Sequence, residues 1–487
     1  MTDNQPNIIL IMTDQQRGDC LGIEGHPVLQ TTNIDRLAHT GTRFRRGYAE
    51  SPSCLPARRS LMTGTAPAAN GMVGFENGVE WNPTHTLAGE LTKAGYQTQL
   101  VGKLHLWPPR KRFGFNHMLL ADSTKAGLPL TGNNDYVDWV REVHGRRETD
   151  PAMAHGVSPN GWVGRPNHLP EEQTHTFWCI DQAMQFLERR DPSTPFFLNI
   201  SFIDPHPPFT PPQLYYDRYE RRDLPPPVVG DWALPFDGPQ KGLSPDAFDI
   251  HLDERDMHCA RAAYYGMINF IDDQIGRLLR YIGKQFTESF VVYASDHGEM
   301  LGDHGLMSKL GFHDQSFHIP MIVRAPMLGD SGLMNRLVEG FTENVDVMPT
   351  VLDLVGLEVP RQCQGRSLRP FLDGSVPAGT LPEGWRTSTH WEFDFRAWAG
   401  LGDQVDLPGH RCNLAVHRDH RGKYVHFAGW PAMFFDLEVD PDERQPLADH
   451  PAMGEYAAAL LDWRMATDEQ ELSDHLALPG GMVVFDN

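Results

Sequence analysis

The chain has 487 residues and few features of membrane, disulfide-bonded or nucleic-acid-binding proteins. Its first apolar run, residues 7–12, is too short to cross a bilayer, and no basic leader precedes it. The six cysteines are spread without close pairs, which indicates reduced thiols rather than a disulfide framework or a zinc ribbon. The net charge of −22 argues against nucleic acid as a partner. We therefore expect a cytoplasmic enzyme that binds neither membranes nor nucleic acid.

The length and a hydrophobic content of 40% suit one large domain and a smaller one. Continuous apolar runs are typical of strands buried on both faces of a parallel sheet, and they occur at 7–12, 196–202 and 290–294. We predict an α/β catalytic domain, residues 1–374, with a mostly parallel central sheet flanked by helices. Residues 375–487 are predicted to form an α+β subdomain with a small antiparallel sheet and a helix.

Two segments, 107–172 and 207–239, are rich in proline and show little periodicity. We predict that both form long irregular loops near the functional site. Loops of this kind commonly determine which substrate is accepted.

Polar residues directly follow two of the buried apolar runs. Asp14 and Gln15 come after the first run, and Asp296 and His297 follow the run at 290–294. Asp14 alone would be interpreted as a helix cap or a turn residue. However, parallel strands place both pairs at the same edge of the sheet, where ligands gather. Oxygen donors with an imidazole suit one divalent ion such as Ca²⁺ or Mn²⁺.

The segment SPSCLPARRSLMTG, residues 51–64, is interpreted as a turn that enters a helix. Pro56 suits the first helical turn, so Cys54 should lie at the positive N-terminal end, where an anion is stabilised. Arg58 would lie on the same face of the helix. Cys54 could instead be a buried structural thiol. A cysteine phosphatase loop is excluded because its longer Cys-to-Arg spacing would need an arginine at position 60, which is serine. We interpret Cys54 as the nucleophile.

The motif CLPAR at 54–58, followed by LMTG at 61–64, resembles the signature of the type I sulfatases of the alkaline phosphatase superfamily. The resemblance covers nearly the whole chain, and residues 296–320 also resemble bacterial phosphonate monoester hydrolases. It implies an alkaline-phosphatase-like fold and oxidation of Cys54 to formylglycine by a formylglycine-generating enzyme. It also implies one metal ion held by a set of five residues: Asp14, Gln15, Cys54, Asp296 and His297.

The same resemblance implies roles for further residues. Lys103 would bind the sulfate, and His105 would be the base that breaks down the covalent adduct. Because both follow a predicted strand, 97–101, we expect an extended chain that points both side chains the same way. His206, in a proline-rich turn, would bind substrate and protonate the leaving group. Lys309 would be a second substrate-binding lysine that could also supply this proton, and Asn77 a further substrate contact.

Together these residues predict hydrolysis of sulfate esters of the arylsulfatase type, with Arg58, Lys103 and Lys309 stabilising the transferred group. The alternative is a phosphonate monoester or phosphodiester hydrolase on the same scaffold. Many sulfatases carry Asp and Asn where this chain has Gln15 and His297, which leaves the identity of the metal open. A non-catalytic binding protein would need a damaged site, but every expected polar position is filled. We expect a homo-oligomer, either a dimer or a tetramer.

Overall fold

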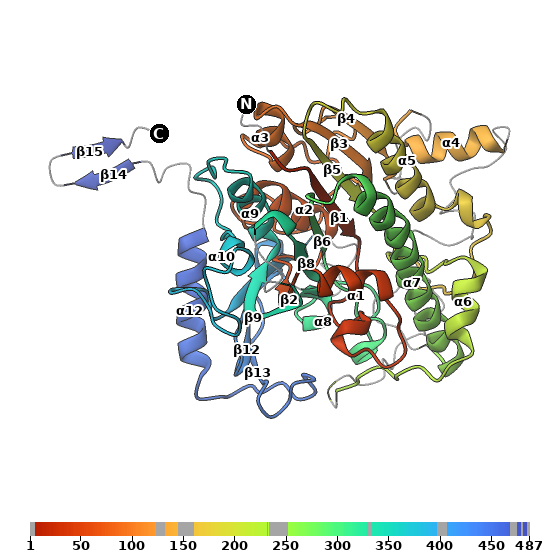
Figure 1. Cartoon of the computed structure of the whole chain (residues 1–487). Coiled ribbons are helices and arrows are strands. Elements are labelled where there is room, and N and C mark those ends of the chain that lie inside the picture. Colours follow the sequence, from red (N-terminus) through yellow and green to blue (C-terminus); the bar gives the residue numbers. More distant parts are fainter. Residues whose placement is uncertain are drawn as a thin grey trace.

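The computed structural model describes residues 5–122, 132–144, 160–230, 232, 252–328, 334–396 and 407–467, and the backbone of two later strands. Within them, a nine-stranded sheet has the order β4-β3-β5-β1-β6-β8-β2-β7, with β9 beside β2 (Figure 1). Its strands span Ile8–Thr13 (β1), Thr42–Tyr48 (β2), Gln97–Gly102 (β3), His117–Leu120 (β4), Phe196–Ser201 (β5), Phe290–Ser295 (β6), His318–Ile319 (β7), Met321–Arg324 (β8) and Arg336–Glu343 (β9).

The central strand β1 runs parallel to both of its neighbours, β5 and β6. Antiparallel pairing is confined to β6 with β8 and to β2 with β7 and β8, so the predicted mostly parallel α/β sheet is confirmed. Thr13 of β1 pairs with Ser295 of β6. Asp14 and Asp296, the next residues, therefore leave the sheet side by side, as their positions after buried strands predicted.

Helices cover both faces of the sheet because the side chains of β1 alternate between two apolar cores. Ile8, Leu10 and Met12 pack in the core that includes α2, α3, α9 and α10. Ile9 and Ile11 pack in the core that includes α1, α4, α5 and α7. The helices span Thr32–His39 (α1), Cys54–Thr63 (α2), Leu87–Lys93 (α3), Asp135–Val143 (α4), His175–Arg189 (α5), Gln213–Glu220 (α6), Glu254–Gln285 (α7), Asp314–Phe317 (α8), Val347–Leu354 (α9), Arg369–Leu372 (α10) and Met453–Thr467 (α12).

A second, antiparallel sheet follows in the C-terminal part of the chain. Its strands span Thr389–Asp394 (β10), Asn413–Arg418 (β11), Gly422–Phe427 (β12) and Met433–Asp436 (β13), and a separate pair spans His475–Leu478 (β14) and Gly481–Val484 (β15). One face packs on the central body through Tyr48, Phe317 and Phe341. The other face packs against α12 through Tyr456 and Leu460. The predicted small antiparallel sheet is confirmed, while the division at residue 374 stays a prediction.

The two segments predicted as irregular contain regular elements. β4 and α4 lie within 107–172, and α6 lies within 207–239, so the prediction of continuous loops is wrong there. The apolar pattern of α4 is only nine residues long and lies among residues of low periodicity. Its N-cap, Asn134, accepts a hydrogen bond from the Val137 N–H at 3.0 Å, which stabilises this short helix. Other parts of both segments lie outside the described residues.

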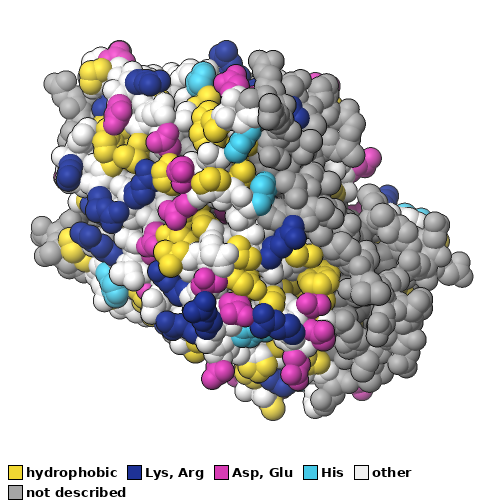
Figure 2. Space-filling view, turned by 90° about the vertical axis from the view of Figure 1, so that its right-hand side faces the viewer, with side chains coloured by type: hydrophobic (Ala, Val, Ile, Leu, Met, Phe, Trp, Pro, Cys, Tyr) yellow, Lys and Arg dark blue, Asp and Glu magenta, His cyan; other side chains and the backbone are white. Residues whose placement is uncertain are grey.

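All six cysteines are free thiols, as the sequence predicted. Among the described residues, no helix is both long and apolar enough to span a membrane. Figure 2 shows the side of the molecule that lies on the right in Figure 1. Basic and acidic side chains are interspersed on this face.

Candidate active site

The candidate site lies where the carboxyl ends of the central strands meet the N-terminus of α2. Cys54 is the first residue of α2 and is preceded by Ser53, whose backbone is extended. The Ala57 N–H donates to the Ser53 carbonyl at 3.1 Å, which closes the first turn around Pro56. All residues of α2 are buried, and Cys54 is only 1% exposed. The predicted helix start at Cys54 is confirmed.

The Cys54 sulfur is surrounded by cationic and polar groups. Lys309 Nζ lies 3.1 Å from Sγ, and His297 Nε2 lies 3.2 Å from it. Burial alone would raise the pKa of the thiol, but the charges of Lys103, Lys309 and His297 and a hydrogen bond with His105 hold this pKa well below its ordinary value. The position of Sγ is therefore a site that stabilises negative charge.

Four buried side chains converge as a possible metal group: Asp14, Cys54, Asp296 and His297, with one ligand atom of each within 4.8 Å of the others. His297 Nδ1 donates to the Gly298 carbonyl at 2.9 Å, which turns Nε2 toward both carboxylates, each 3.7 Å away. Burial and the neighbouring charge of Asp14 raise the pKa of Asp296. Two crowded carboxylates with an oriented imidazole fit a divalent cation.

Arg58 joins this group to the ends of four adjacent strands. Its Nε donates to Asp296 at 2.8 Å, and its Nη2 to Asp14 at 3.3 Å. Its Nη1 donates to the Lys103 carbonyl at 3.0 Å and to the Ser201 hydroxyl at 2.9 Å. Residues 14, 103, 201 and 296 lie at the ends of β1, β3, β5 and β6, so one guanidinium fixes the geometry of the whole edge.

Gln15 has a left-handed backbone (φ 71°) and a side chain held in one orientation. Its amide nitrogen donates to the carboxylate of Glu299 and, at 3.3 Å, to Ser308 Oγ. Because a carboxylate only accepts, Glu299 fixes which end of the amide is nitrogen. The amide oxygen therefore faces the site, where it accepts from Lys309 Nζ at 3.0 Å.

Lys103 and His105 both lower the pKa of Cys54, the first by its charge and the second by a hydrogen bond, but they do not lie on an extended chain. Gly102 has φ 109° and His105 has φ 57°, so the predicted strand-like geometry is wrong. A Cβ at Gly102 would lie 1.9 Å from the Ser201 carbonyl oxygen, which only glycine avoids. The N–H groups of Leu104 and His105 donate to Asp122 at 2.7 and 2.9 Å and hold the bend. Lys103 Nζ forms an ion pair with Asp14.

His206 and Lys309 contact each other beside Cys54. His206 Nδ1 donates to the Pro207 carbonyl at 2.8 Å, so Nε2 accepts from Lys309 Nζ at 3.0 Å. Burial and the charge of Lys309 lower the pKa of His206. In this arrangement the transferable proton is on Lys309.

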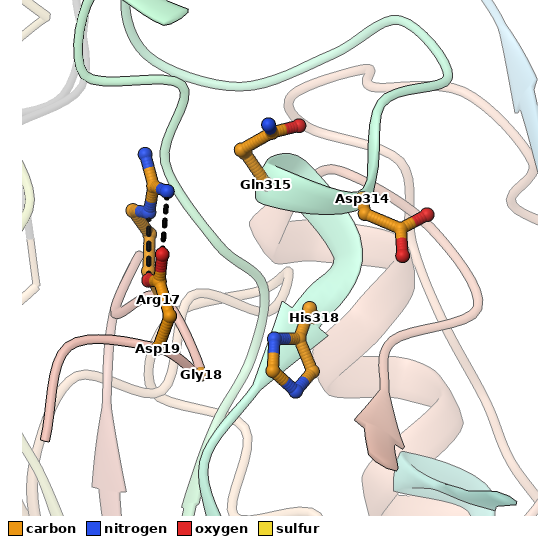
Figure 3. Close-up of a pocket in the computed structure, with 6 residues that line it drawn as sticks. All are labelled: Arg17, Gly18, Asp19, Asp314, Gln315 and His318. Carbon is orange, nitrogen blue, oxygen red and sulfur yellow. Dashed lines mark hydrogen bonds and ion pairs between the residues drawn. The ribbon is translucent and has the colours of Figure 1, made fainter. Parts of the chain in front are cut away.

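A separate hollow opens beside the loop that follows β1. It is lined by Arg17, Gly18, Asp19, Asp314, Gln315 and His318, and Arg17 forms an ion pair with Asp19 at 2.6 Å (Figure 3). Its lining contains none of the residues around Cys54. The hollow is therefore distinct from the candidate active site.

Comparison with known proteins agrees with this geometry. A model of the sulfatase family matches residues 6–357. The chain belongs to the sulfatase family. A second model, described as N-sulphoglucosamine sulphohydrolase, C-terminal, matches residues 302–470. These matches confirm the resemblance carried by the CLPAR motif.

The proteins similar to this sulfatase-family chain include an arylsulfatase, a multifunctional alkaline phosphatase superfamily protein and a phosphonate monoester hydrolase. An arylsulfatase of Clostridium perfringens is 35% identical, with 90% of this chain and 89% of that protein covered. The multifunctional alkaline phosphatase superfamily protein PehA of Trinickia caryophylli is 34% identical, with 98% of each chain covered. The crystal structure of the phosphonate monoester hydrolase of Agrobacterium radiobacter has a TM-score of 0.82 at 30% identity, covering 99% of this chain and 100% of that one.

The structure thus brings together nearly all of the residues predicted from the sequence of this sulfatase-family member. Asn77 differs, because it lies in an exposed turn, and its predicted substrate contact stays a prediction. Sequence reasoning missed Glu299, Asp122 and Ser201, which orient the side chain or backbone of the predicted residues. Glu299 could have been found, since it ends the Asp-His-Gly-Glu turn that begins with Asp296.

Proposed function

We propose that this chain hydrolyses sulfate monoesters and releases inorganic sulfate with an alcohol or phenol. The observation that carries the proposal is the group of cations and hydrogen-bond donors that lowers the pKa of Cys54. A sulfate monoester carries a single organic substituent, so Lys103, Lys309 and His105 can approach its non-bridging oxygens together. Such preorganised donors stabilise the charge of a transition state strongly in a buried site.

The donor set fits a divalent ion, as its crowded carboxylates indicate. Asp14, Asp296, His297 and residue 54 would hold the ion, together with the Gln15 amide oxygen that Glu299 turns toward the site. An ion such as Ca²⁺ or Mn²⁺ would supply Lewis-acid stabilisation of negative charge at residue 54.

We further propose that a formylglycine-generating enzyme converts Cys54 to formylglycine. Hydrated formylglycine would give residue 54 two hydroxyl groups, one for attack on sulfur and one for the later release of sulfate. Mass spectrometry of the peptide that contains residue 54 tests this, because conversion removes H₂S and adds one oxygen. Full activity of protein that carries only the unmodified thiol would contradict it.

The two proton transfers of the reaction would be carried out by side chains near residue 54. Lys309 is placed to protonate the leaving alcohol, because it holds the proton that His206 Nε2 accepts. His206 then orients Lys309 rather than donating first, which refines its predicted role as the proton donor. His105 contacts residue 54 and is placed to remove a proton from it when sulfate leaves.

The second candidate function is hydrolysis of phosphonate monoesters or phosphodiesters. It is favoured by the 34% identity to PehA over 98% of this chain and by the similarity to a phosphonate monoester hydrolase. Both kinds of substrate carry a second organic group that must fit beside Lys103 and His105. We therefore propose that sulfate esters are preferred and that phosphorus esters are side substrates.

One aryl leaving group presented as a sulfate, a phosphate diester and a phosphonate separates the two candidates. We expect kcat/KM to be at least about tenfold higher for the sulfate. Cys54→Ala is the control, since loss of all three activities assigns them to this site. A higher kcat/KM for the phosphonate would replace the first candidate by the second.

A further inference from the structure

The loop that carries Lys309 has a strained backbone on both sides of the lysine. Ser308 and Leu310, on either side of the lysine, have φ values of 69° and 92°. Non-glycine residues in this left-handed region are strained, and they persist only where surrounding contacts fix them. The position of Lys309 Nζ, 3.1 Å from Cys54 Sγ, therefore depends on groups outside the loop.

The N-terminal half of the loop is fixed from within the catalytic region. Glu299 accepts hydrogen bonds from the N–H groups of Leu301, at 2.8 Å, and of Ser308. The Met300 N–H donates to the Ser308 carbonyl at 2.6 Å. These bonds close the loop up to the residue before Lys309.

The C-terminal half is fixed instead by β12 and by the turn that follows β13. Lys423 of β12 donates to the Phe312 carbonyl at 2.9 Å, and Glu443 accepts from His313 Nδ1 at 3.1 Å. Lys423 and Glu443 form an ion pair with each other, and their side chains are 0% and 2% exposed. The ring of Phe312 lies 5.8 Å from that of Phe427 in the same sheet.

The ion pair has the properties of a positioning device rather than a stabilising one. Burying two charges removes their hydration at a large cost, so apolar residues of similar volume often give equal or greater stability. The pair holds the backbone carbonyl of Phe312 and the ring of His313, three and four residues after Lys309. Glu443 itself has φ 56°, so its own backbone is held in a strained conformation to make this contact.

We propose that Lys423 and Glu443 are positioning residues that place Lys309 against residue 54 and the substrate. The inference rests on the proposed role of Lys309 in the reaction. It makes Lys423 and Glu443, which lie 114 and 134 residues beyond the lysine in sequence, a required part of the active site.

A double-mutant cycle tests the proposal with an aryl sulfate as substrate. Lys423→Met together with Glu443→Gln replaces the ion pair by uncharged side chains of similar size. We expect kcat to fall about 10²-fold, with a much smaller change in KM, because a catalytic group is misplaced. In a Lys309→Met background the same two substitutions should leave the residual kcat unchanged.

The matched control is Arg421→Met with Glu455→Gln, which removes an exposed ion pair of the same subdomain and should leave kcat unchanged. Circular dichroism and Tm check that each variant is folded, and Glu443→Gln alone serves if the paired variant does not fold. An equal loss of kcat in both backgrounds would overturn the proposal, since the pair would then act on the fold. Full activity of Lys309→Met would instead overturn the proposed role of Lys309.

Discussion

The two buried lysines of the site are held in different ways. Lys103 is 1% exposed, follows β3 directly and forms an ion pair with Asp14. Burial lowers its pKa, but Asp14 and Cys54 outweigh this and raise the pKa above its ordinary value. Lys309 is 5% exposed and lies on a loop, where its hydrogen bonds go to a thiol, an imidazole and an amide. The charge of Lys103 is compensated by a carboxylate, whereas, among the described residues, the hydrogen bonds of Lys309 go to no carboxylate.

This difference separates stability from activity at neighbouring positions. Removing one member of a buried ion pair leaves the other charge uncompensated, at a cost of about 3–5 kcal/mol. A lysine without a carboxylate partner leaves no such charge behind. We therefore expect changes at Lys103 to affect both folding and rate, and changes at Lys309 to affect mainly the rate.

Lys309→Met should give the largest effect. We expect kcat/KM for an aryl sulfate to fall about 10³-fold, because a donor aimed at the transition state is lost. The free energy of unfolding should stay within about 1 kcal/mol of the parent value. Steady-state kinetics and urea unfolding measure the two quantities. A loss of stability as large as that of a broken ion pair would contradict the comparison.

Lys103→Met should lower both quantities. We expect a loss of about 3 kcal/mol in the free energy of unfolding, since Asp14 loses its ion pair with Lys103, and a fall in kcat/KM of about 10²-fold. Urea unfolding in the presence of a chelator isolates the effect of the ion pair from that of a metal. Lys93→Met, at a position 63% exposed, is the control that should change neither quantity. Unchanged stability of the Lys103 variant would refute its structural role.

Gln15→Glu tests the hydrogen bond by which Glu299 orients the Gln15 side chain. The new carboxylate would face that of Glu299, which now accepts from the Gln15 amide, so we expect a loss of about 2 kcal/mol in the free energy of unfolding. Adding Glu299→Gln restores an amide opposite a carboxylate and should recover most of the loss. Thermal or urea unfolding of the two single variants and the swapped pair measures this coupling. Additive losses would show that the two side chains act independently.

Asp272 is a buried carboxylate, and no cationic group contributes to its pKa shift. Its substitution should give the smallest effect of these variants. It accepts hydrogen bonds from the N–H groups of Asn33 and Ile34 at the start of α1, and burial raises its pKa from 3.8 to about 7. Because the folded state binds this proton more tightly, the resulting stability is complete below the unfolded pKa and is lost as pH rises through about 7. The pKa of Asp14 shifts in the opposite direction. Burial and Cys54 raise it, but Lys103, His206 and Arg58 outweigh them and lower it below its ordinary value.

Asp272→Asn should therefore flatten the decline of the unfolding free energy between roughly pH 4 and pH 7. Urea unfolding at several pH values measures the slope. The exposed Asp256 of the same helix provides the control, since Asp256→Asn should leave the slope as it is. An identical slope in the Asp272 variant would mean that this carboxyl does not titrate in that range.

The sheet edge that carries the candidate metal group could be predicted from sequence because one physical rule places it. Continuous apolar runs predicted β1 and β6, and parallel pairing then put Asp14 beside Asp296. β2 was missed, since its sequence TRFRRGY has three arginines and its pairing depends on strands more than 270 residues later. The positions of Lys103, His206 and Lys309 came from the family resemblance, as no periodicity could bring a loop lysine to a histidine 103 residues away.

The contacts that hold these site residues in place could not be predicted from the sequence, for a different reason. Glu443 lies in a polar turn that resembles any surface turn, yet it is buried against His313. The bend at Lys103 to His105 depends on Asp122, which sits at the end of a strand whose pattern was too short to predict. Such contacts are set by tertiary packing, so only the structure reveals them.

The guanidinium of Arg58 also has a consequence for the order in which the chain folds. Its acceptors belong to residues 14, 103, 201 and 296, which leave four neighbouring strands of very different sequence position. An incomplete sheet would leave this charge buried without partners, so α2 gains little by docking until β1, β3, β5 and β6 have aligned. Distant strand pairing of this kind is slow, because loop closure precedes the contacts that stabilise it. We therefore expect the docking of α2, and with it the assembly of the site, to be a late event in folding.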